Sequence, residues 1–152
     1  MTVNSGHWII PTGTTLNIND YNNNGWKFGY ASAYTRIPCD VVPSKPFVWE
    51  YEITEMNPSY TSATLISSDY FANNYPNKIV LYGKNNSQVT VYNGSIIGKY
   101  SMKVYSDVLE LYKDGIKLGH VAKTDATTQI MLETGVQSNR YMRIKNLKFK
   151  PL

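Results

Sequence analysis

The chain has 152 residues, a formal net charge of +4, and 42% hydrophobic and 13% aromatic residues. This length is typical of one domain with its own hydrophobic core, so we predict a single domain over residues 1–152. The only cysteine, Cys39, excludes an intramolecular disulfide and a paired-thiolate zinc site, and the mild basicity does not by itself indicate a nucleic-acid partner.

Short strands separated by turn signals are predicted along the chain, because apolar and polar residues alternate with a period of two and no segment keeps a helical period. Two loops are predicted at 20–25 and 68–77, the second of them polar and aromatic. This spacing predicts an all-β fold, a two-sheet antiparallel β-sandwich of the jelly-roll type. In chain order, the predicted strands are 7–10, 15–18, 26–30, 47–56, 63–67, 78–82, 88–92, 100–105, 108–113, 116–121, 129–134 and 141–149.

The strand at 47–56 and the hairpin at 108–121 have the clearest patterns. In the strand, the odd positions from Phe47 to Ile53 are aromatic or aliphatic, while Glu50 and Glu52 face the other side. In the hairpin, Asp114-Gly115 separates two alternating runs. That dipeptide predicts a type I′ turn, which requires positive φ at both central residues.

Three of these segments resemble the concanavalin A-like lectin/glucanase superfamily, which includes the laminin-G-like domains. They are the aromatic strand FVWEYEIT at 47–54, the hairpin VLELYKDGIKLG at 108–119 and the closing strand YMRIKNLKFKPL at 141–152. The resemblance covers most of residues 26–152 and lies in the strand pattern. It implies a jelly roll with a concave face that often binds glycans. Similar hairpins and closing strands occur in sandwich domains of phage tail proteins and microbial adhesins.

Glu50, Glu52 and Glu55 have the spacing E-x-E-x-x-E. It is similar to the E-x-D-x-x-E strand of the laminarinase-type glucanases in this superfamily, whose outer glutamates act as nucleophile and acid/base. Retaining hydrolysis needs two carboxyl groups on one face, about 5–5.5 Å apart, and Glu55 reaches the face of the other two only through a β-bulge. The middle residue is Glu instead of Asp, and the tryptophan- and glycine-rich flank is missing. We therefore expect solvent-facing charges and no enzyme, with β-glucan hydrolysis as the alternative.

Asp20, Asn22 and Asn24, followed by Gly25, fit the first half of a calcium-loop pattern. The twelfth position would be Ala31 instead of a bidentate glutamate, and the segment supplies only one carboxylate. We therefore expect an ordinary turn and no cofactor, with calcium at these three residues as the alternative.

Tyrosine and asparagine concentrate in the predicted loops, and the chain has 13 tyrosines. Tyrosine supplies a rigid ring with a hydroxyl, and asparagine supplies a donor and an acceptor, which suits sugar hydroxyls. Tyrosine also fits strand faces for purely structural reasons, so both explanations stay open. The residues that we predict to contact a ligand are Tyr70, Asn73, Asn74, Tyr75, Tyr60, Trp26, Tyr34 and Arg36.

These patterns predict a non-catalytic carbohydrate-binding domain that recognises a cell-surface glycan, as part of a phage tail receptor-binding protein or an adhesin-like protein. The alternative is a structural or oligomerisation domain of a virion appendage, with tyrosine-rich faces buried between subunits. The first ten residues lack a basic start and a long apolar run, so we expect no signal peptide, and no segment predicts membrane insertion. The expected location is a virion appendage or an extracellular surface, and homo-oligomerisation is left open.

Overall fold

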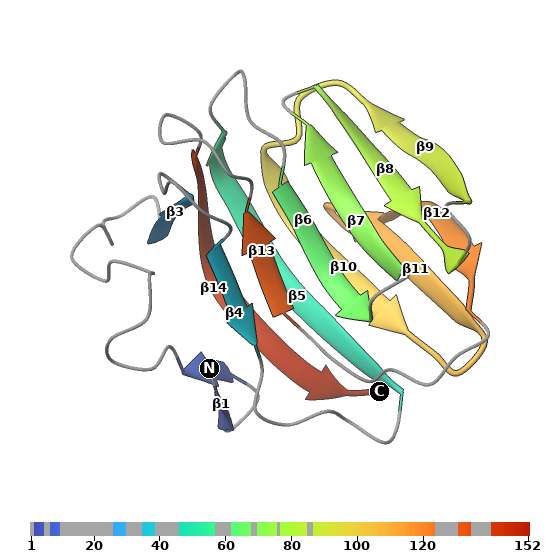
Figure 1. The fold of residues 1–152 in the computed structure, drawn as a ribbon, viewed down its shortest axis with the longest axis horizontal. Helices are drawn as coiled ribbons and strands as arrows, with labels where there is room; N and C mark the ends of the chain where they lie inside the picture. Colours follow the sequence, from blue (N-terminus) through green and yellow to red (C-terminus); the bar gives the residue numbers. More distant parts are fainter. Residues whose placement is uncertain are drawn as a thin grey trace.

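Two antiparallel sheets lie face to face in the computed structural model (Figure 1). The structure describes residues 2–4, 7–9, 26–29, 35–38, 46–56, 62–67, 70–75, 77–84, 87–123, 131–134 and 141–152. The two-sheet all-β sandwich predicted from the sequence is confirmed. The predicted strand at 15–18 and the predicted loop at 20–25 lie outside the described residues.

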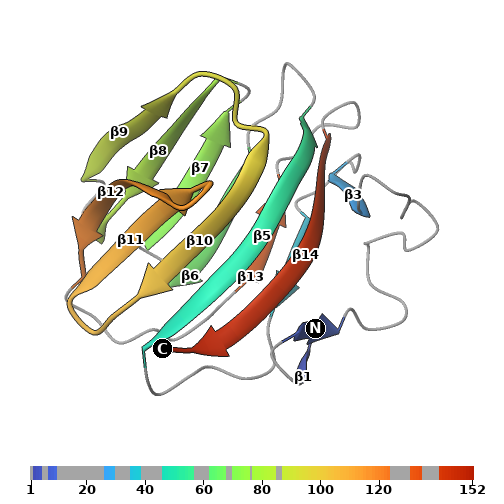
Figure 2. The ribbon, with the colours of Figure 1, turned by 180° about the vertical axis from the view of Figure 1, so that it is seen from behind.

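The larger sheet has eight strands among the described residues and forms the layer that faces the viewer in Figure 2. From one edge to the other, its strands are β1 (Thr2–Asn4), β2 (His7–Ile9), β14 (Tyr141–Pro151), β5 (Phe47–Met56), β10 (Gly98–Val104), β11 (Val108–Lys113) and β12 (Ile116–Ala122), and β3 (Trp26–Gly29) also pairs with β14. The long strands β5 and β14 are neighbours, so residues 47–56 lie beside the last strand of the chain.

The smaller sheet has six strands among the described residues and lies in front in Figure 1. Its strands, in spatial order, are β4 (Thr35–Pro38), β13 (Met131–Thr134), β6 (Ser62–Ser67), β7 (Tyr70–Tyr75), β8 (Lys78–Tyr82) and β9 (Gln88–Asn93). Strands β6 to β9 are consecutive in the chain and form a meander.

One predicted element is wrong, because residues 70–75 form a strand instead of part of a loop. This strand, β7, pairs along its length with β6 on one side and β8 on the other. Asparagine is depleted in strands, so the strand propensity of a segment with Asn73 and Asn74 is too low to predict a strand there. Backbone pairing on both sides stabilises the strand despite that low propensity. By contrast, β5, β8 and β11 have the predicted bounds.

The predicted turn between β11 and β12 is confirmed. Asp114 has a φ of 50° and Gly115 a φ of 83°, so both central residues have the positive φ of a type I′ turn. The turn also contacts β10, because the Lys99 amide donates a hydrogen bond to the Asp114 carboxylate at 3.0 Å.

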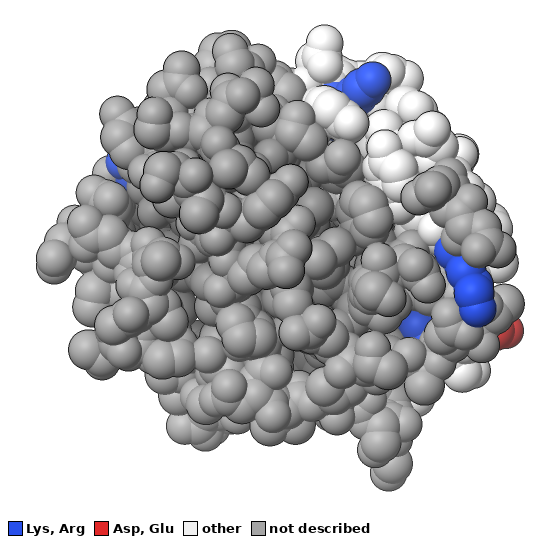
Figure 3. All heavy atoms as spheres, viewed as in Figure 1, with Lys and Arg blue, Asp and Glu red and all other residues white. Residues whose placement is uncertain are grey.

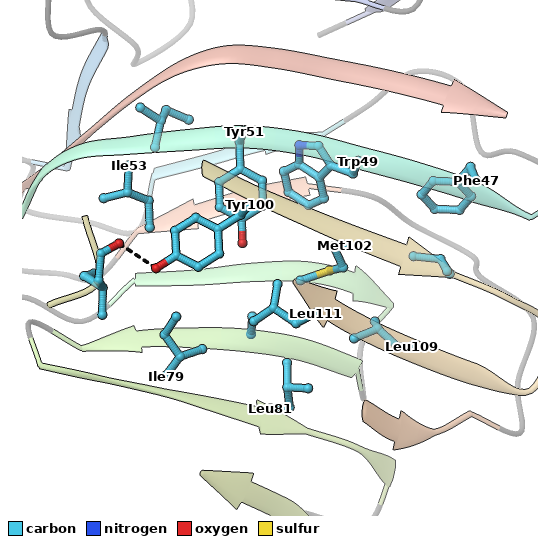
Figure 4. Close-up of a cluster of buried hydrophobic side chains, with 14 residues drawn as sticks. Phe47, Trp49, Tyr51, Ile53, Ile79, Leu81, Tyr100, Met102, Leu109 and Leu111 are labelled. Carbon is cyan, nitrogen blue, oxygen red and sulfur yellow. Dashed lines mark hydrogen bonds between the residues drawn. The ribbon is translucent and has the colours of Figure 1, made fainter. Parts of the chain in front are cut away.

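The core lies between the two sheets and is built from alternate residues of each strand (Figure 4). From the larger sheet, the predicted odd positions of β5, from Phe47 to Ile53, are buried. Tyr51 stacks on Tyr100 with ring centroids 5.3 Å apart, and the Tyr100 hydroxyl donates a hydrogen bond to the Ile96 carbonyl. The smaller sheet contributes Ala72, Ile79 and Leu81 to the same core.

The two sheets approach each other closely at one edge, where β12 of the larger sheet meets β9 of the smaller sheet. A Cβ atom at Gly119 would lie 2.5 Å from Cγ1 of Val91. The missing side chain at position 119 therefore lets these two edge strands pack against each other.

Candidate functional site

The outer face of β7, β8 and β9 presents aromatic and polar side chains together. Ala72 and Asn74 of β7 are buried, so the alternation of the strand places Tyr75 on the outer face. In β8, Ile79 and Leu81 belong to the core, and Lys78 and Tyr82 therefore lie on the same outer face as Tyr75. We call this surface the tyrosine face and define it as Tyr75, Lys78, Tyr82, Gln88, Thr90 and Asn93.

The β8–β9 register adds the last three of these residues. Asn93 pairs with Lys78, Thr90 with Val80, and Gln88 with Tyr82, and paired residues share a face. Ile79 pairs with Tyr92 and Val80 with Thr90, so Val91 forms a bulge in β9. This bulge brings Thr90 and Asn93 to the same face although their positions differ by three. All three residues of β9 are exposed, so amide and hydroxyl groups border the tyrosines.

Contacts within the tyrosine face hold its rings in place. The Lys78 ammonium lies 4.8 Å from the centroid of the Tyr75 ring, a cation–π contact. Burial raises the pKa of Tyr75, and a side-chain hydrogen bond with Tyr82 raises it further, so Tyr75 is a neutral hydroxyl at physiological pH. Strand alternation places Val80 on the outer face of β8, yet its side chain is only 5% exposed. The other side chains of the tyrosine face therefore cover it.

The chemistry of the tyrosine face suits an uncharged, hydroxyl-rich ligand. Figure 3 shows the molecule from this side, and the described part of the surface is mostly white, with blue cationic groups at separate places and a red acidic group at the right edge. A tyrosine ring offers an apolar surface with a polar edge, and amide groups both donate and accept hydrogen bonds. Aromatic rings bordered by amides and a hydroxyl can therefore contact both the C–H and the O–H groups of a sugar.

The structure places five of the eight predicted ligand residues in the six-stranded sheet. Tyr70, Asn73, Asn74 and Tyr75 belong to β7, and Arg36 belongs to β4. Of these, Tyr75 lies on the tyrosine face. Asn74 is 0% exposed and points into the sandwich, so in this structure it cannot contact a ligand on the outer face.

The other three predicted residues are not brought to the tyrosine face by the described structure. Trp26 belongs to β3, which pairs with β14 in the eight-stranded sheet. Tyr34 and Tyr60 lie outside the described residues, as do the calcium candidates Asp20, Asn22 and Asn24. Ligand contact by these residues stays a prediction, and the burial of Asn74 argues against it for that one residue.

The ligand residues predicted from the sequence do not include Tyr82, Lys78 or the polar residues of β9. The sequence does indicate the orientation of Tyr82. It ends the predicted strand 78–82, in which Ile79 and Leu81 face the core, and strand alternation therefore places Tyr82 on the outer face. The partnership of Tyr82 with Tyr75 could not be found without the pairing of β7 with β8, since residues 68–77 were predicted as a loop.

Glu50, Glu52 and Glu55 share the outer face of the eight-stranded sheet, on the opposite side of the sandwich. Residue Arg143 pairs with Glu55 and the next residue, Ile144, pairs with Ile53, so Thr54 forms the bulge that brings Glu55 to this face. Arg143 donates a hydrogen bond from Nε to Oε2 of Glu55 at 2.8 Å. Glu55 thus has a structural partner on the neighbouring strand.

The part of the chain that the structure describes holds neither a metal-binding cluster nor a membrane-spanning helix. No three His, Cys, Asp or Glu side chains gather there as a metal site would require. The described residues also contain no helix that could cross a membrane.

Solved structures similar to this chain include proteins named for carbohydrate binding. The carbohydrate-binding module CBM66 from Bacillus subtilis has a TM-score of 0.63 at 15% identity, over 99% of this chain and 98% of the module. Sheep galectin-11, in complex with glycerol, has a TM-score of 0.56 at 7% identity, over 78% of this chain and 98% of the galectin. A sialidase has a TM-score of 0.64 at 11% identity, over 83% of this chain, which spans only 15% of the sialidase.

No protein-family model and no curated protein sequence matches the chain. At these low identities the structural likeness shows the fold. The two-sheet jelly-roll fold that the sequence resemblance implies is confirmed.

Proposed function

We propose that this chain is a non-catalytic carbohydrate-binding domain and that the tyrosine face is its ligand site. The observation that carries the proposal is the grouping of Tyr75 and Tyr82 with three exposed polar residues of β9 on one mostly uncharged surface. The fold shared with a carbohydrate-binding module and with galectins supports it. The Glu55–Arg143 contact supports a structural role for Glu55, the third glutamate of the E-x-E-x-x-E pattern.

The ligand that we propose is a cell-surface glycan, and the domain belongs to a phage tail receptor-binding protein or an adhesin-like protein. Its location is then a virion appendage or an extracellular surface. The support for this context is the sequence resemblance to sandwich domains of such proteins. Single-site affinity is expected to be weak, with useful strength from several copies displayed together.

A glycan array that includes microbial cell-wall polymers, probed with the domain in multivalent form, tests the proposal. Tyr75→Ala and Tyr82→Ala should each remove most of the binding, because each deletes a ring from the tyrosine face. Tyr112→Ala is the matched control, since Tyr112 makes a similar cation–π contact with Lys103, at 4.5 Å, on the opposite sheet. Absence of any binding by the folded protein, or equal loss in all three variants, would overturn the proposal.

The second candidate function is an oligomerisation domain. It is favoured by two exposed isoleucines at the same end of the eight-stranded sheet. Ile116, which is 70% exposed, begins β12, and Ile97, which is 45% exposed, immediately precedes β10. Light scattering of the purified chain separates the two candidates. A stable oligomer that Ile116→Lys dissociates would support the second, and a monomer with sugar affinity would support the first.

A further inference from the structure

A polar hollow lies on the outer face of the eight-stranded sheet, away from the tyrosine face. Its volume is about 380 Å³, and it lies over the neighbouring strands β10, β5 and β14, which run side by side in Figure 2. The side chains that line it come from all three strands: Glu50, Glu52, Lys99, Ser101 and Asn146. Small-molecule pockets in proteins are commonly about 300–1,000 Å³, so this one has room for a single sugar ring.

A β-bulge in β14 shapes one wall of the hollow. Lys145 pairs with Glu52 and Lys148 pairs with Glu50, so β14 has one more residue than β5 over this stretch. Asn146 takes a φ of 55° there, a left-handed conformation that asparagine tolerates better than most residues. The bulge aims the Asn146 amide at β5, where its Nδ2 donates a hydrogen bond to Oε2 of Glu52 at 3.2 Å.

The opposite wall, on β10, carries polar side chains that make no hydrogen bond within the described part of the chain. Among the described residues, no hydrogen bond engages the Lys99 ammonium or the Ser101 hydroxyl. Tyr51 and Tyr100 also line the hollow, but their rings are buried in the core (Figure 4), so their main chain forms its floor. The hollow therefore offers hydrogen-bonding groups of both kinds and no aromatic platform.

We propose that this hollow is a second saccharide site, which binds one hydroxyl-rich sugar unit through hydrogen bonds alone. Glu52 accepts from sugar hydroxyls, Lys99 and Asn146 donate to them, and Ser101 does both, which matches adjacent hydroxyls that each donate and accept. Hydrogen bonds to charged groups are the stronger ones, so Glu52 and Lys99 contribute most. The hollow and the tyrosine face lie on opposite sides of the sandwich and share no residue, so binding in the hollow does not require the tyrosine face.

Two sites on opposite faces would let one domain link two glycan chains. The tyrosine face would hold its ligand by aromatic contact, and the hollow would hold its ligand by polar contact. Displayed in several copies, such a domain would crosslink a polysaccharide layer instead of only adhering to it.

Residue-resolved amide NMR on the Tyr75→Ala variant isolates the hollow from the tyrosine face. The probes are D-glucose, D-fructose and D-glucosamine, titrated one at a time. At least one sugar should shift the amides of residues 50–52, 99–101 and 145–147 with saturating behaviour. No shift in these segments with any of the three sugars would overturn the second site, and the proposed function would be judged separately from shifts in β7–β9 of the unmodified protein.

Matched variants establish that the shifts report binding in the hollow. Glu52→Ala should weaken the sugar about tenfold or more, and Ser101→Ala, which keeps both glutamates, about threefold to tenfold. The control is Glu110→Ala, which removes a carboxylate from the same sheet face but outside the hollow, where it is paired with Lys117 at 2.6 Å. Unchanged affinity in both hollow variants, or equal weakening in the control, would overturn the proposal.

Discussion

The two outer faces of this sandwich are produced by the same strand alternation but carry different chemistry. The tyrosine face joins two rings to uncharged polar groups, whereas the eight-stranded sheet carries charged side chains and, outside the hollow, pairs several of them with one another. Its ion pairs among the described residues include Lys113–Asp114, Lys117–Glu110 and Arg143–Glu55. The comparison shows that alternation decides which residues face outward, while the partners of those residues decide what is left for a ligand.

A shared local contact makes this difference clearer. Each face has a tyrosine under a lysine, Tyr75 with Lys78 and Tyr112 with Lys103. Around Tyr112, Glu110 accepts a hydrogen bond from the Tyr112 hydroxyl at 3.4 Å and is paired with a lysine. Around Tyr75, the neighbours are a second tyrosine and exposed amides. Both faces have the cation–π contact, so this contact does not make the tyrosine face a ligand site. The groups that surround the contact make that difference.

The largest effect should come from the core that both faces share. Trp49 is fully buried and contacts Tyr51, so Trp49→Ala leaves a cavity that the two rigid sheets cannot close. We expect the free energy of unfolding to fall by about 3–5 kcal/mol, measured by denaturant titration. Ile116→Ala, at an exposed position, is the control and should change it by less than about 0.5 kcal/mol. If both variants lost a similar free energy of unfolding, the buried Trp49 would contribute no more than an exposed side chain, and this description of the core would be wrong.

The edge where the two sheets meet should be nearly as sensitive. Gly119→Ala forces a methyl group against Val91, whose Cγ1 and Cβ atoms would lie 2.5 and 3.2 Å from it. We expect a loss of about 1–3 kcal/mol from overpacking. The double variant with Val91→Ala should recover part of that loss, because it removes the atom in closest contact. Strict additivity of the two changes would show that β12 and β9 do not touch.

The sequence was sufficient where a strand keeps its inner face apolar. In β5, β8 and β11 the inward residues are aromatic or aliphatic, and the predicted bounds match the structure. It was insufficient for β7, whose buried positions hold Ala72 and Asn74. A small residue and an amide at the inner positions give no alternation signal, although the strand lies in the interior of its sheet. The predicted ligand residues consequently included one that faces the core.

The candidate site depended on pairings that the sequence does not show. Tyr75 was predicted as a ligand residue, but Tyr82 and the residues of β9 join it only through the register of the meander. For Glu55, the sequence indicated that a bulge was necessary and could not place one. The bulge at Thr54 follows from the pairing of β5 with β14, which are almost a hundred residues apart in the chain, so no local pattern specifies it.

Adjacent residues of β7 should separate stability from binding. Asn74 is fully buried, and among the described residues neither its Nδ2 nor its Oδ1 has a hydrogen-bond partner. Leucine has nearly the same shape as asparagine but lacks the amide group. We therefore expect Asn74→Leu to raise the free energy of unfolding by about 1 kcal/mol. Glycan binding should be unchanged, in contrast to Tyr75→Ala. A loss of stability in Asn74→Leu would contradict the expected cost of burying the unpaired amide.

The smallest effect should be an acid sensitivity that belongs to the eight-stranded sheet. The hydrogen bond from the Lys99 amide, and then the contact with Lys113, hold the pKa of Asp114 below its ordinary value of 3.8. A carboxyl group with a lowered folded-state pKa adds stability above its unfolded-state pKa, and this stability is lost as the pH falls below that value. Asp114→Asn keeps a residue that tolerates the positive φ of the turn, so thermal unfolding of this variant should depend less on pH below about pH 4. An identical acid dependence in the variant and the parent protein would assign the sensitivity to other carboxyl groups and would remove this electrostatic difference between the two faces.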